Sequence, residues 1–143
     1  MTDLVQEFAD KYRVQDLVIF ENDCWSVSLR PEQKTPFSLF ISIKDEVFRM
    51  SDLSIEQHRG LQECYVYVES LVFLKLKATK INYYSLMMVD PIVHFHVFPR
   101  FESSVRLDNK VIHDVYYPKP VDLMDGFSLD ILRLCLNYLR GID

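Results

Sequence analysis

The chain has 143 residues, of which 49% are hydrophobic, so it is long enough to bury one core and close to the commonest size of a single domain. Its 16 Lys and Arg residues against 21 Asp and Glu give a net charge of −5, which argues against nonspecific binding to nucleic acid by a basic face. No stretch reaches the roughly 18 uncharged apolar residues that a membrane helix needs. We therefore expect one domain, residues 1–143, with neither nucleic acid nor a membrane as its partner.

The first 44 residues are predicted to form one helix and three strands. Residues 2–12 place apolar side chains at helical spacing: Leu4, Val5, Phe8 and Tyr12. The period then changes to two, with an apolar run at 16–22, an alternating segment at 24–30 and a third strand at 38–44. In the second segment Ser26 and Ser28 alternate with apolar residues, as in a half-buried strand. We expect these three strands to pair sequentially and antiparallel.

The remainder of the chain is predicted to add a long helix, two strands and a last helix. Ser54 followed by Gln57 forms a capping box ahead of a helical pattern over 54–77. Strand patterns return at 81–89 and 92–101, turned around Asp90-Pro91, and leucines lie on one side of a helix over about 128–140. The prediction is an α+β fold with about five antiparallel strands, one long helix packed on them, and helices at both ends.

The cysteines and the N-terminal segment predict a cytoplasmic protein. Cys24, Cys64 and Cys135 are odd in number, far apart and in apolar surroundings, which indicates reduced core thiols rather than a disulfide framework or a zinc site. The first twelve residues, MTDLVQEFADKY, carry acids where a secretory signal needs a basic start, so we expect no processing.

The segment VDPIVHFHVFPRF, residues 89–101, carries the candidate chemistry. On a strand, His94 and His96 share one face with Phe98, with their Cα atoms ~6.8 Å apart, while the alternate residues form an apolar face. The apolar face is the expected core face, so both histidines are predicted to lie on an exposed one. Three interpretations are open for this pair: exposed residues without a function, metal ligands, or parts of an active site.

The metal interpretation needs a third and usually a fourth ligand. Glu102 follows at a longer spacing than the usual cupin pattern, and three glycines are too few for the many tight turns of a cupin. We therefore predict neither a metal nor another cofactor.

The sequence VHFHVFPR, preceded by a proline-containing turn and the strand beginning Ile81-Asn82, resembles the signature of the histidine triad family of nucleotide hydrolases and transferases. That signature is His-h-His-h-His-h-h, where h is apolar, commonly continued by Pro-Arg. Aligned on it, His96 is the third histidine, His94 is the middle one, and Ile92 stands where the first would be. Residues 25–57 are similar to the N-terminal half of the family in the order of their strands, loop and helix start, so the resemblance covers nearly the whole chain.

The resemblance implies a hydrolase of the dinucleoside polyphosphate type, which cleaves a nucleotidyl phosphoanhydride or phosphoramidate. His94 would be the nucleophile that attacks the α-phosphorus and forms a nucleotidyl-histidine intermediate, and His96 would stabilise developing charge. Family members commonly pair through the long helix and a sheet edge, so a homodimer is also implied. The helix supports this because its large apolar residues run almost all round it: Tyr65, Tyr67, Val68, Leu71, Val72, Phe73 and Leu74.

The departures from the family pattern concern the substrate contacts. Ser38 stands where a further histidine is common, Arg30 where an acidic or amide residue holds the ribose, and Met87 and Met88 where relatives often have Gly and Asn near the phosphates. Arg30 could bind two phosphate oxygens or pair with Glu32. The resulting substrate-binding prediction comprises five residues: Arg30, Gln33, Thr35, Ser38 and Met88.

Three further residues are predicted to lie outside the site, with Arg100 ending its strand in a pair with a carboxylate and His58 and His113 exposed to solvent. The function classes that stay open are a nucleotide phosphohydrolase, a noncatalytic nucleotide-binding or protein-interaction module that has kept the fold, and a metal-dependent or unrelated activity. Covalent nucleotidylation of His94 would distinguish the first from the second.

Overall fold

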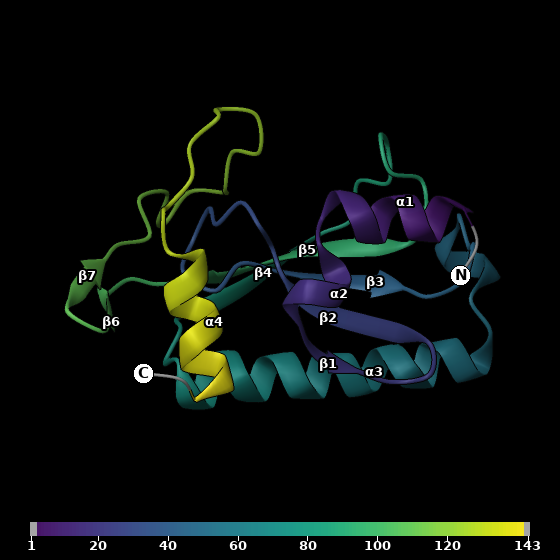
Figure 1. Cartoon of the computed structure of the whole chain (residues 1–143), viewed down its shortest axis with the longest axis horizontal. Coiled ribbons are helices and arrows are strands. Elements are labelled where there is room, and N and C mark those ends of the chain that lie inside the picture. Colours follow the sequence, from purple (N-terminus) through teal and green to yellow (C-terminus); the bar gives the residue numbers. More distant parts are fainter. Residues whose placement is uncertain (1–2, 142–143) are drawn as a thin grey trace.

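Five antiparallel strands form the central sheet of this computed structural model, which describes residues 3–141. In chain order the strands are β1 (Val18–Glu21), β2 (Trp25–Leu29), β3 (Leu39–Ile43), β4 (Lys80–Tyr84) and β5 (His94–Arg100). Their order across the sheet is β1-β2-β3-β5-β4, and every neighbouring pair is antiparallel (Figure 1). The predicted α+β fold, its five strands and the sequential pairing of the first three are therefore confirmed.

One face of the sheet is covered by the long helix, α3 (Ile55–Glu69), which runs on as the π-helical segment η2 (Ser70–Lys75). The helix begins where the capping box predicts. The Ser54 hydroxyl accepts a hydrogen bond from the backbone N–H of Gln57 at 3.0 Å, and the Gln57 side chain accepts one from the backbone N–H of Ser54 at 2.8 Å. Phe95 of β5 points to this helix, with its ring centroid 6.3 Å from that of Tyr65.

The opposite face is covered by two N-terminal helices, α1 (Asp3–Lys11) and α2 (Val14–Leu17) (Figure 1). The first matches the helix predicted over 2–12, of which residue 2 lies outside the described residues; α2 is not predicted by the sequence pattern. Because both faces are covered, all five residues of β2 are buried, including Ser26 and Ser28. The prediction of a half-buried strand is wrong. Alternation shows which residues share a face but not whether that face meets water, and small serine side chains can pack beneath a helix.

Two predicted strands are shorter in the structure than in the sequence pattern. β4 ends at Tyr84 rather than at 89, and β5 begins at His94 rather than at 92. Between them Met87 has a φ of 51°, in the left-handed region, so the chain turns away from the sheet although its residues are apolar.

The last helix, α4 (Leu132–Arg140), also begins later than the predicted 128. The reason is tertiary: the backbone N–H of Leu129 donates to the carbonyl of Gln33 at 2.7 Å, so Leu129 forms a β-bridge with Gln33 instead of joining the helix. Three short elements are not predicted, because strands or turns of three residues show no periodicity: η1 (Met50–Asp52), β6 (Val105–Leu107) and β7 (Lys110–Ile112).

The three cysteines are free thiols. Cys64 and Cys135 are buried as predicted, and burial raises the pKa of each thiol to about 12, which keeps it protonated and unreactive. Cys24 is only half-buried, so the prediction of a core position is wrong for it. Among residues 3–141 the helices are all too short or too polar to cross a membrane.

Candidate functional site

His94 and His96 lie side by side on one face of β5, with ring centroids 5.2 Å apart, as the strand period predicts. The prediction that this face is exposed is wrong, because the exposed fractions of the two side chains are 2% and 7%. Phe8 of α1 lies over His94 at 4.8 Å between ring centroids, and Phe40 of β3 lies 5.0 Å from His96. The histidine pair is therefore enclosed between the sheet and the first helix.

The main chain before β5 orients the His94 ring. Its Nδ1 lies 2.7 Å from the carbonyl oxygen of Ile92, and because a carbonyl only accepts, Nδ1 carries the proton. Burial lowers the pKa of His94, although the bond to Ile92 opposes that effect, so the ring is neutral near pH 7. Nε2 then carries the lone pair. Ile92 stands where the family signature has its first histidine. It orients His94 through its backbone carbonyl, so this contact does not require a histidine side chain.

Asp90 ties the loop before the histidines to the end of α1. The Tyr12 hydroxyl donates to its carboxylate at 2.6 Å, and the Lys11 ammonium lies 3.1 Å away. Burial acts to raise the pKa of Asp90, but these hydrogen bonds outweigh it and hold the pKa below its usual value. The carboxylate is charged at neutral pH, so the two contacts hold α1 over His94.

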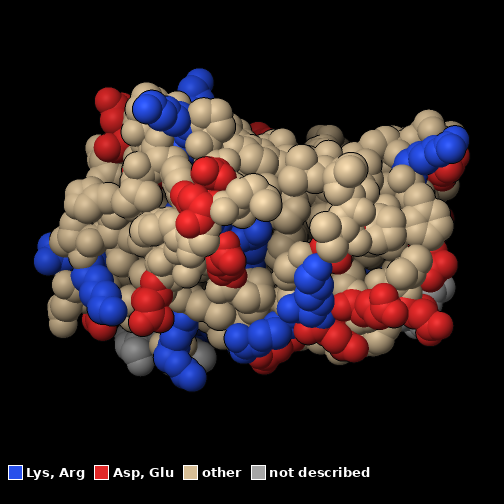
Figure 2. All heavy atoms as spheres, turned by 90° about the horizontal axis from the view of Figure 1, so that it is seen from above, with Lys and Arg blue, Asp and Glu red and all other residues tan. Residues whose placement is uncertain are grey.

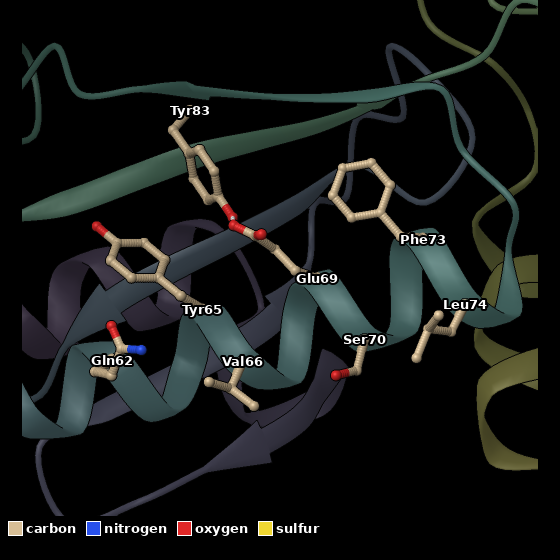
Figure 3. Close-up of a pocket in the computed structure, with 8 residues that line it drawn as sticks. All are labelled: Gln62, Tyr65, Val66, Glu69, Ser70, Phe73, Leu74 and Tyr83. Atoms are coloured by element: carbon tan, nitrogen blue, oxygen red, sulfur yellow. Dashed lines mark hydrogen bonds between the residues drawn. The ribbon is translucent and has the colours of Figure 1, made fainter.

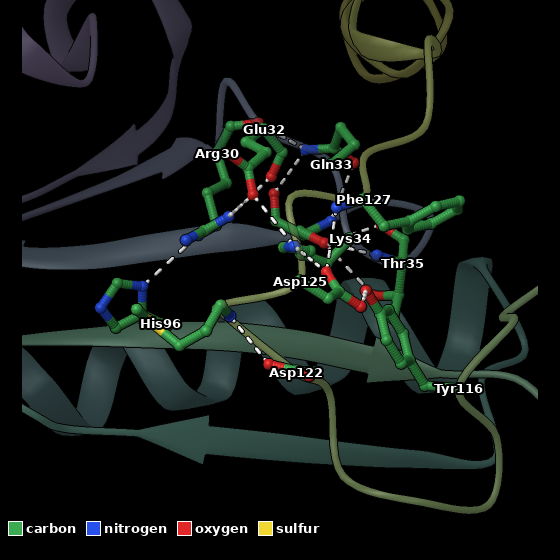
Figure 4. Close-up of polar contacts among 12 residues, drawn as sticks. Arg30, Glu32, Gln33, Lys34, Thr35, His96, Tyr116, Asp122, Asp125 and Phe127 are labelled. Atoms are coloured by element: carbon green, nitrogen blue, oxygen red, sulfur yellow. Dashed lines mark hydrogen bonds and ion pairs between the residues drawn. The ribbon is translucent and has the colours of Figure 1, made fainter.

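Arg30 contacts the other histidine (Figure 4). Its Nε lies 3.4 Å from Nδ1 of His96, and its Nη1 donates to the backbone carbonyl of Glu32 at 2.9 Å. The guanidinium also lies over the rings of Phe40 and Phe98, 5.4 Å from each centroid. Burial, then the charge of Arg30 and the neighbouring His94, lower the pKa of His96 to about 3, so this ring too is neutral.

Next to Arg30, a buried lysine joins two segments that are distant in the sequence. The side chain of Lys34 is 0% exposed and contacts Asp125 at 2.8 Å and Glu32 at 3.2 Å, while the Tyr116 hydroxyl donates to Asp125 at 2.6 Å (Figure 4). These bonds hold the loop over 30–36 against the C-terminal loop, residues 113–131. On the face in Figure 2, acidic side chains gather around a recessed basic one near the middle. No sequence motif marks Lys34 or Asp125, because nothing local relates residues 91 positions apart.

Three of the predicted substrate-binding residues bond to their own loop. Gln33 donates to the carbonyls of Arg30 at 2.7 Å and Ser38 at 2.8 Å, and it accepts from the Ser38 N–H at 3.0 Å. The Ser38 hydroxyl donates to the carbonyl of Thr35 at 2.7 Å and accepts from its N–H at 3.0 Å. All three side chains are buried, so they shape the loop that carries Arg30. Contact of Gln33, Thr35 and Ser38 with a substrate stays a prediction.

The other predicted residues lie as follows. Met88 is 84% exposed in the loop between β4 and β5, and its contact with a substrate also stays a prediction. Arg100 pairs with buried Asp114 at 2.8 Å, which confirms its predicted structural role. His58 and His113 are exposed, as predicted. Within residues 3–141, three or more His, Cys, Asp or Glu side chains do not come together in a group that could hold a metal ion.

A cavity of about 250 Å³ lies on the histidine face, between the first two helices and the sheet. Ser42, in its floor, is the cross-strand partner of His94, so the cavity lies beside the histidine pair. The helices contribute a mostly apolar wall and the strands a more polar one, from these residues: Val5, Phe8, Ala9, Val14, Gln15, Glu21, Ser26, Ser42, Ile43 and Lys44.

A larger groove of about 670 Å³ lies on the other side of the molecule, between the long helix and the edge strand β4 (Figure 3). The Tyr83 hydroxyl of β4 donates to the Glu69 carboxylate of α3 at 2.8 Å across it. The residues that line the groove are Gln62, Tyr65, Val66, Glu69, Ser70, Phe73, Leu74 and Tyr83.

Solved structures of histidine triad proteins have the same fold as this chain. A histidine triad protein from Sinorhizobium meliloti is 18% identical, with a TM-score of 0.67 over 90% of this chain and 92% of that one. The diadenosine triphosphate hydrolase of Plasmodium falciparum is 10% identical, with a TM-score of 0.60 over 97% and 95%. The NitFhit protein of C. elegans is 20% identical, with a TM-score of 0.55, and is matched over 61% of this chain but only 22% of that longer one.

These similarities show that the chain has the histidine triad fold, which confirms the fold that the resemblance in the sequence implies. No protein-family model matches the sequence, and the comparison with curated proteins gave no match.

Proposed function

We propose that this chain, which has the histidine triad fold, is a nucleotide phosphohydrolase that cleaves a nucleotidyl phosphoanhydride or phosphoramidate through a nucleotidyl-His94 intermediate. The observation that carries the proposal is the state of His94. Its ring is neutral, its Nδ1–H is bonded to the Ile92 carbonyl at 2.7 Å, and its Nε2 carries a lone pair next to a second histidine. A nucleophilic imidazole requires this combination of charge and tautomer.

The reaction would proceed in two displacements. In the first, the Nε2 lone pair of His94 bonds to the α-phosphorus, and the bond from phosphorus to the leaving oxygen or nitrogen breaks. The electron pair of that bond stays on the leaving atom, which takes a proton from solvent. In the second, water attacks the phosphorus and loses a proton, the bond to Nε2 breaks, and its electron pair returns to His94 as the mononucleotide leaves.

The cavity beside the histidine pair would hold the nucleoside. Its volume of about 250 Å³ is below the range of drug-sized pockets and therefore fits a single ring system. The apolar wall of α1 and α2 would stack on a base, while the hydroxyls of Ser26 and Ser42 offer polar contacts. Since Ser42 pairs with His94 across the sheet, a base in this cavity would leave its phosphate near Nε2.

The proposed partner is a second copy of the chain. The groove of Figure 3 lies between apolar side chains of α3 and η2 and the strand β4, which forms the edge of the sheet. An edge strand offers unpaired backbone groups to a partner strand, and a self-complementary patch of this kind suits a two-fold dimer.

Leu74→Lys is expected to convert the dimer into a monomer. Leu74 lines the groove and is 68% exposed, so a charge there would be buried at the two-fold interface without harming the monomer. Sedimentation at micromolar concentration gives the mass of the wild type and the variant. Ile55→Lys is the matched control, because Ile55 lies on the same helix, is 73% exposed and is outside the groove. A wild type that sediments at 17.0 kDa would contradict the proposed dimer.

The proposed compartment is the cytosol. The chain has three free thiols and no disulfide among its described residues, and Cys64 and Cys135 lie where oxidants reach them poorly. Reduced thiols of this kind are typical of cytosolic proteins.

The experiment that tests the function is incubation of the pure protein with a panel of adenylylated and guanylylated compounds. The panel includes dinucleoside polyphosphates, for phosphoanhydrides, and nucleoside phosphoramidates. We expect release of mononucleotide from at least one class and an acid-labile nucleotide label on the protein during single turnover. Failure of every compound to give either product would overturn the proposal.

A noncatalytic nucleotide-binding module is the second candidate, and one observation favours it. His94 is 2% exposed beneath Phe8, so an α-phosphate reaches its Nε2 only if α1 shifts or the substrate enters from the side of the cavity. Micromolar binding of nucleotide to a protein that never becomes labelled would establish this second function.

A further inference from the structure

The contact between Arg30 and His96 determines which nitrogen of the His96 ring carries its proton. Nε of Arg30 lies 3.4 Å from Nδ1 of His96. A guanidinium nitrogen only donates, so Nδ1 must accept and therefore has no proton. In a neutral imidazole the proton then resides on Nε2, the nitrogen that does not face Arg30.

Three contacts hold the guanidinium in the position that this bond needs. Its Nη1 donates to the carbonyl of Glu32 at 2.9 Å, and its Cζ lies over the rings of Phe40 and Phe98, 5.4 Å from each centroid. The side chain is only 10% exposed. A planar group with several fixed donors keeps its direction better than the single ammonium of a lysine would.

We propose that Arg30 is a positioning residue that holds His96 in the Nε2–H tautomer, so that His96 donates a hydrogen bond to a phosphate or leaving-group oxygen. The inference rests on the proposed function for the identity of the acceptor. It assigns Arg30 a different task from the phosphate binding that the sequence predicts, because Nε and Nη1 are both engaged within the protein.

The charged and titratable groups around His96 agree with this assignment. Arg30 faces it from the loop after β2 and His94 from its own strand; Asp90 acts on it from the loop before β5, and Glu32 acts through its pair with Arg30. Burial is the largest effect on the pKa of His96, followed by the charge of Arg30 and by His94, and all three lower it; only Asp90 opposes them. A protonated His96 would carry a proton on Nδ1, facing the donor N–H groups and the positive charge of Arg30. The neutral ring is therefore the form that donates from Nε2.

The tautomer can be measured on the wild type without any substrate. Long-range proton–nitrogen correlation spectra of histidine side chains distinguish a nitrogen that carries a proton from one that does not. We expect His96 to show the Nε2–H tautomer at pH 7 and no titration between pH 5 and 8, because its pKa is about 3. A His96 that is protonated at Nδ1, or that titrates near its ordinary pKa of about 6.5, would overturn the proposal.

Arg30→Met removes the charge and the donor but keeps an unbranched chain over the two phenyl rings. We expect a mixture of His96 tautomers and a rise of ~1 unit in the pKa of His96, since the charge of Arg30, the largest lowering effect after burial, is lost. Arg30→Lys keeps the charge without the planar donor, so the pKa should stay low while the tautomer preference weakens. Arg59→Met, on the exposed surface of α3, is the matched control and should leave both unchanged.

With a substrate in hand, Arg30→Met should lower kcat by about 10-fold and change KM by less than about 3-fold, because it weakens a donor rather than a binding contact. A large rise in KM with an unchanged His96 spectrum would overturn the proposal and favour direct phosphate binding. If Arg30→Met does not fold, the wild-type tautomer and Arg30→Lys decide. A wild type with the expected tautomer but no turnover of any compound would leave the positioning contact standing and remove the proposed hydrolase function.

Discussion

Replacing His94 by alanine is expected to reduce nucleotide release to the uncatalysed background while nucleotide binding persists. The reason is geometric: His94 Nδ1 is fixed on the Ile92 carbonyl at 2.7 Å, which leaves Nε2 as the lone pair directed away from the backbone. His96 cannot replace it as the nucleophile. The lone pair of His96 is on Nδ1, which faces Arg30, and its Nε2 carries the proton in the proposed tautomer. Single-turnover release of mononucleotide, measured together with the acid-labile protein label, tests this expectation.

Two other histidine variants make that result specific. His96→Ala should keep activity at a level reduced by about 10²-fold, since it removes a stabilising donor but not the attacking atom. His113→Ala should behave like the wild type, because His113 is exposed and outside the motif. Equal loss in His94→Ala and His96→Ala, with no trapped intermediate in the wild type, would refute the roles assigned to the pair.

Replacing Arg100 by methionine is expected to destabilise the fold by about 3–5 kcal/mol, which is typical of breaking one side of a buried ion pair. The guanidinium donates to Asp114 at 2.8 Å, to the carbonyl of Lys119 at 2.6 Å and to Asn82 at 2.9 Å. Its loss would leave the Asp114 carboxylate, which is fully buried, without its counter-charge. Urea unfolding at neutral pH measures the change in the free energy of unfolding.

The control for Arg100→Met is Arg106→Met, at an exposed position of β6, which should change the free energy of unfolding by less than about 0.5 kcal/mol. Adding Asp114→Asn to Arg100→Met should recover part of the lost stability, because the unpaired charge is then removed. A destabilisation below about 1 kcal/mol in Arg100→Met would show that the pair does not anchor the C-terminal loop to β5.

The local features of the fold could be predicted from the sequence because their causes are local. The capping box at Ser54 and Gln57 sets the start of α3 through bonds within one helical turn. The period of two places His94 and His96 on one face of a strand whatever surrounds that strand. The order of motifs along the chain resembles that of the histidine triad family, and this resemblance predicts the fold that the solved structures show.

The environment of the site depends on contacts between distant segments, and no periodicity encodes them. Alternation shows which residues share a face but not what covers that face, so the burial of His94 beneath Phe8 could not be predicted. For the same reason nothing in the sequence indicated that Lys34 would meet Asp125, 91 positions later.

The loop residues show the division between sequence and tertiary structure most clearly. The resemblance to the family predicts Arg30, Gln33, Thr35 and Ser38 near a nucleotide, because these residues are polar and lie in the segment that aligns with its substrate contacts. The tertiary structure decides where those bonds go: Gln33, Thr35 and Ser38 bond within their own loop, and Arg30 reaches a histidine 66 positions away. Local geometry and period in the sequence thus predict the helices, the strands and the histidine pair, and the resemblance to the histidine triad family predicts the fold. Only the packing of α1, the loop over 30–36 and the C-terminal loop determined the burial of that pair and its polar partners, because a buried polar group must bond to whatever group the chain brings within about 3 Å of it.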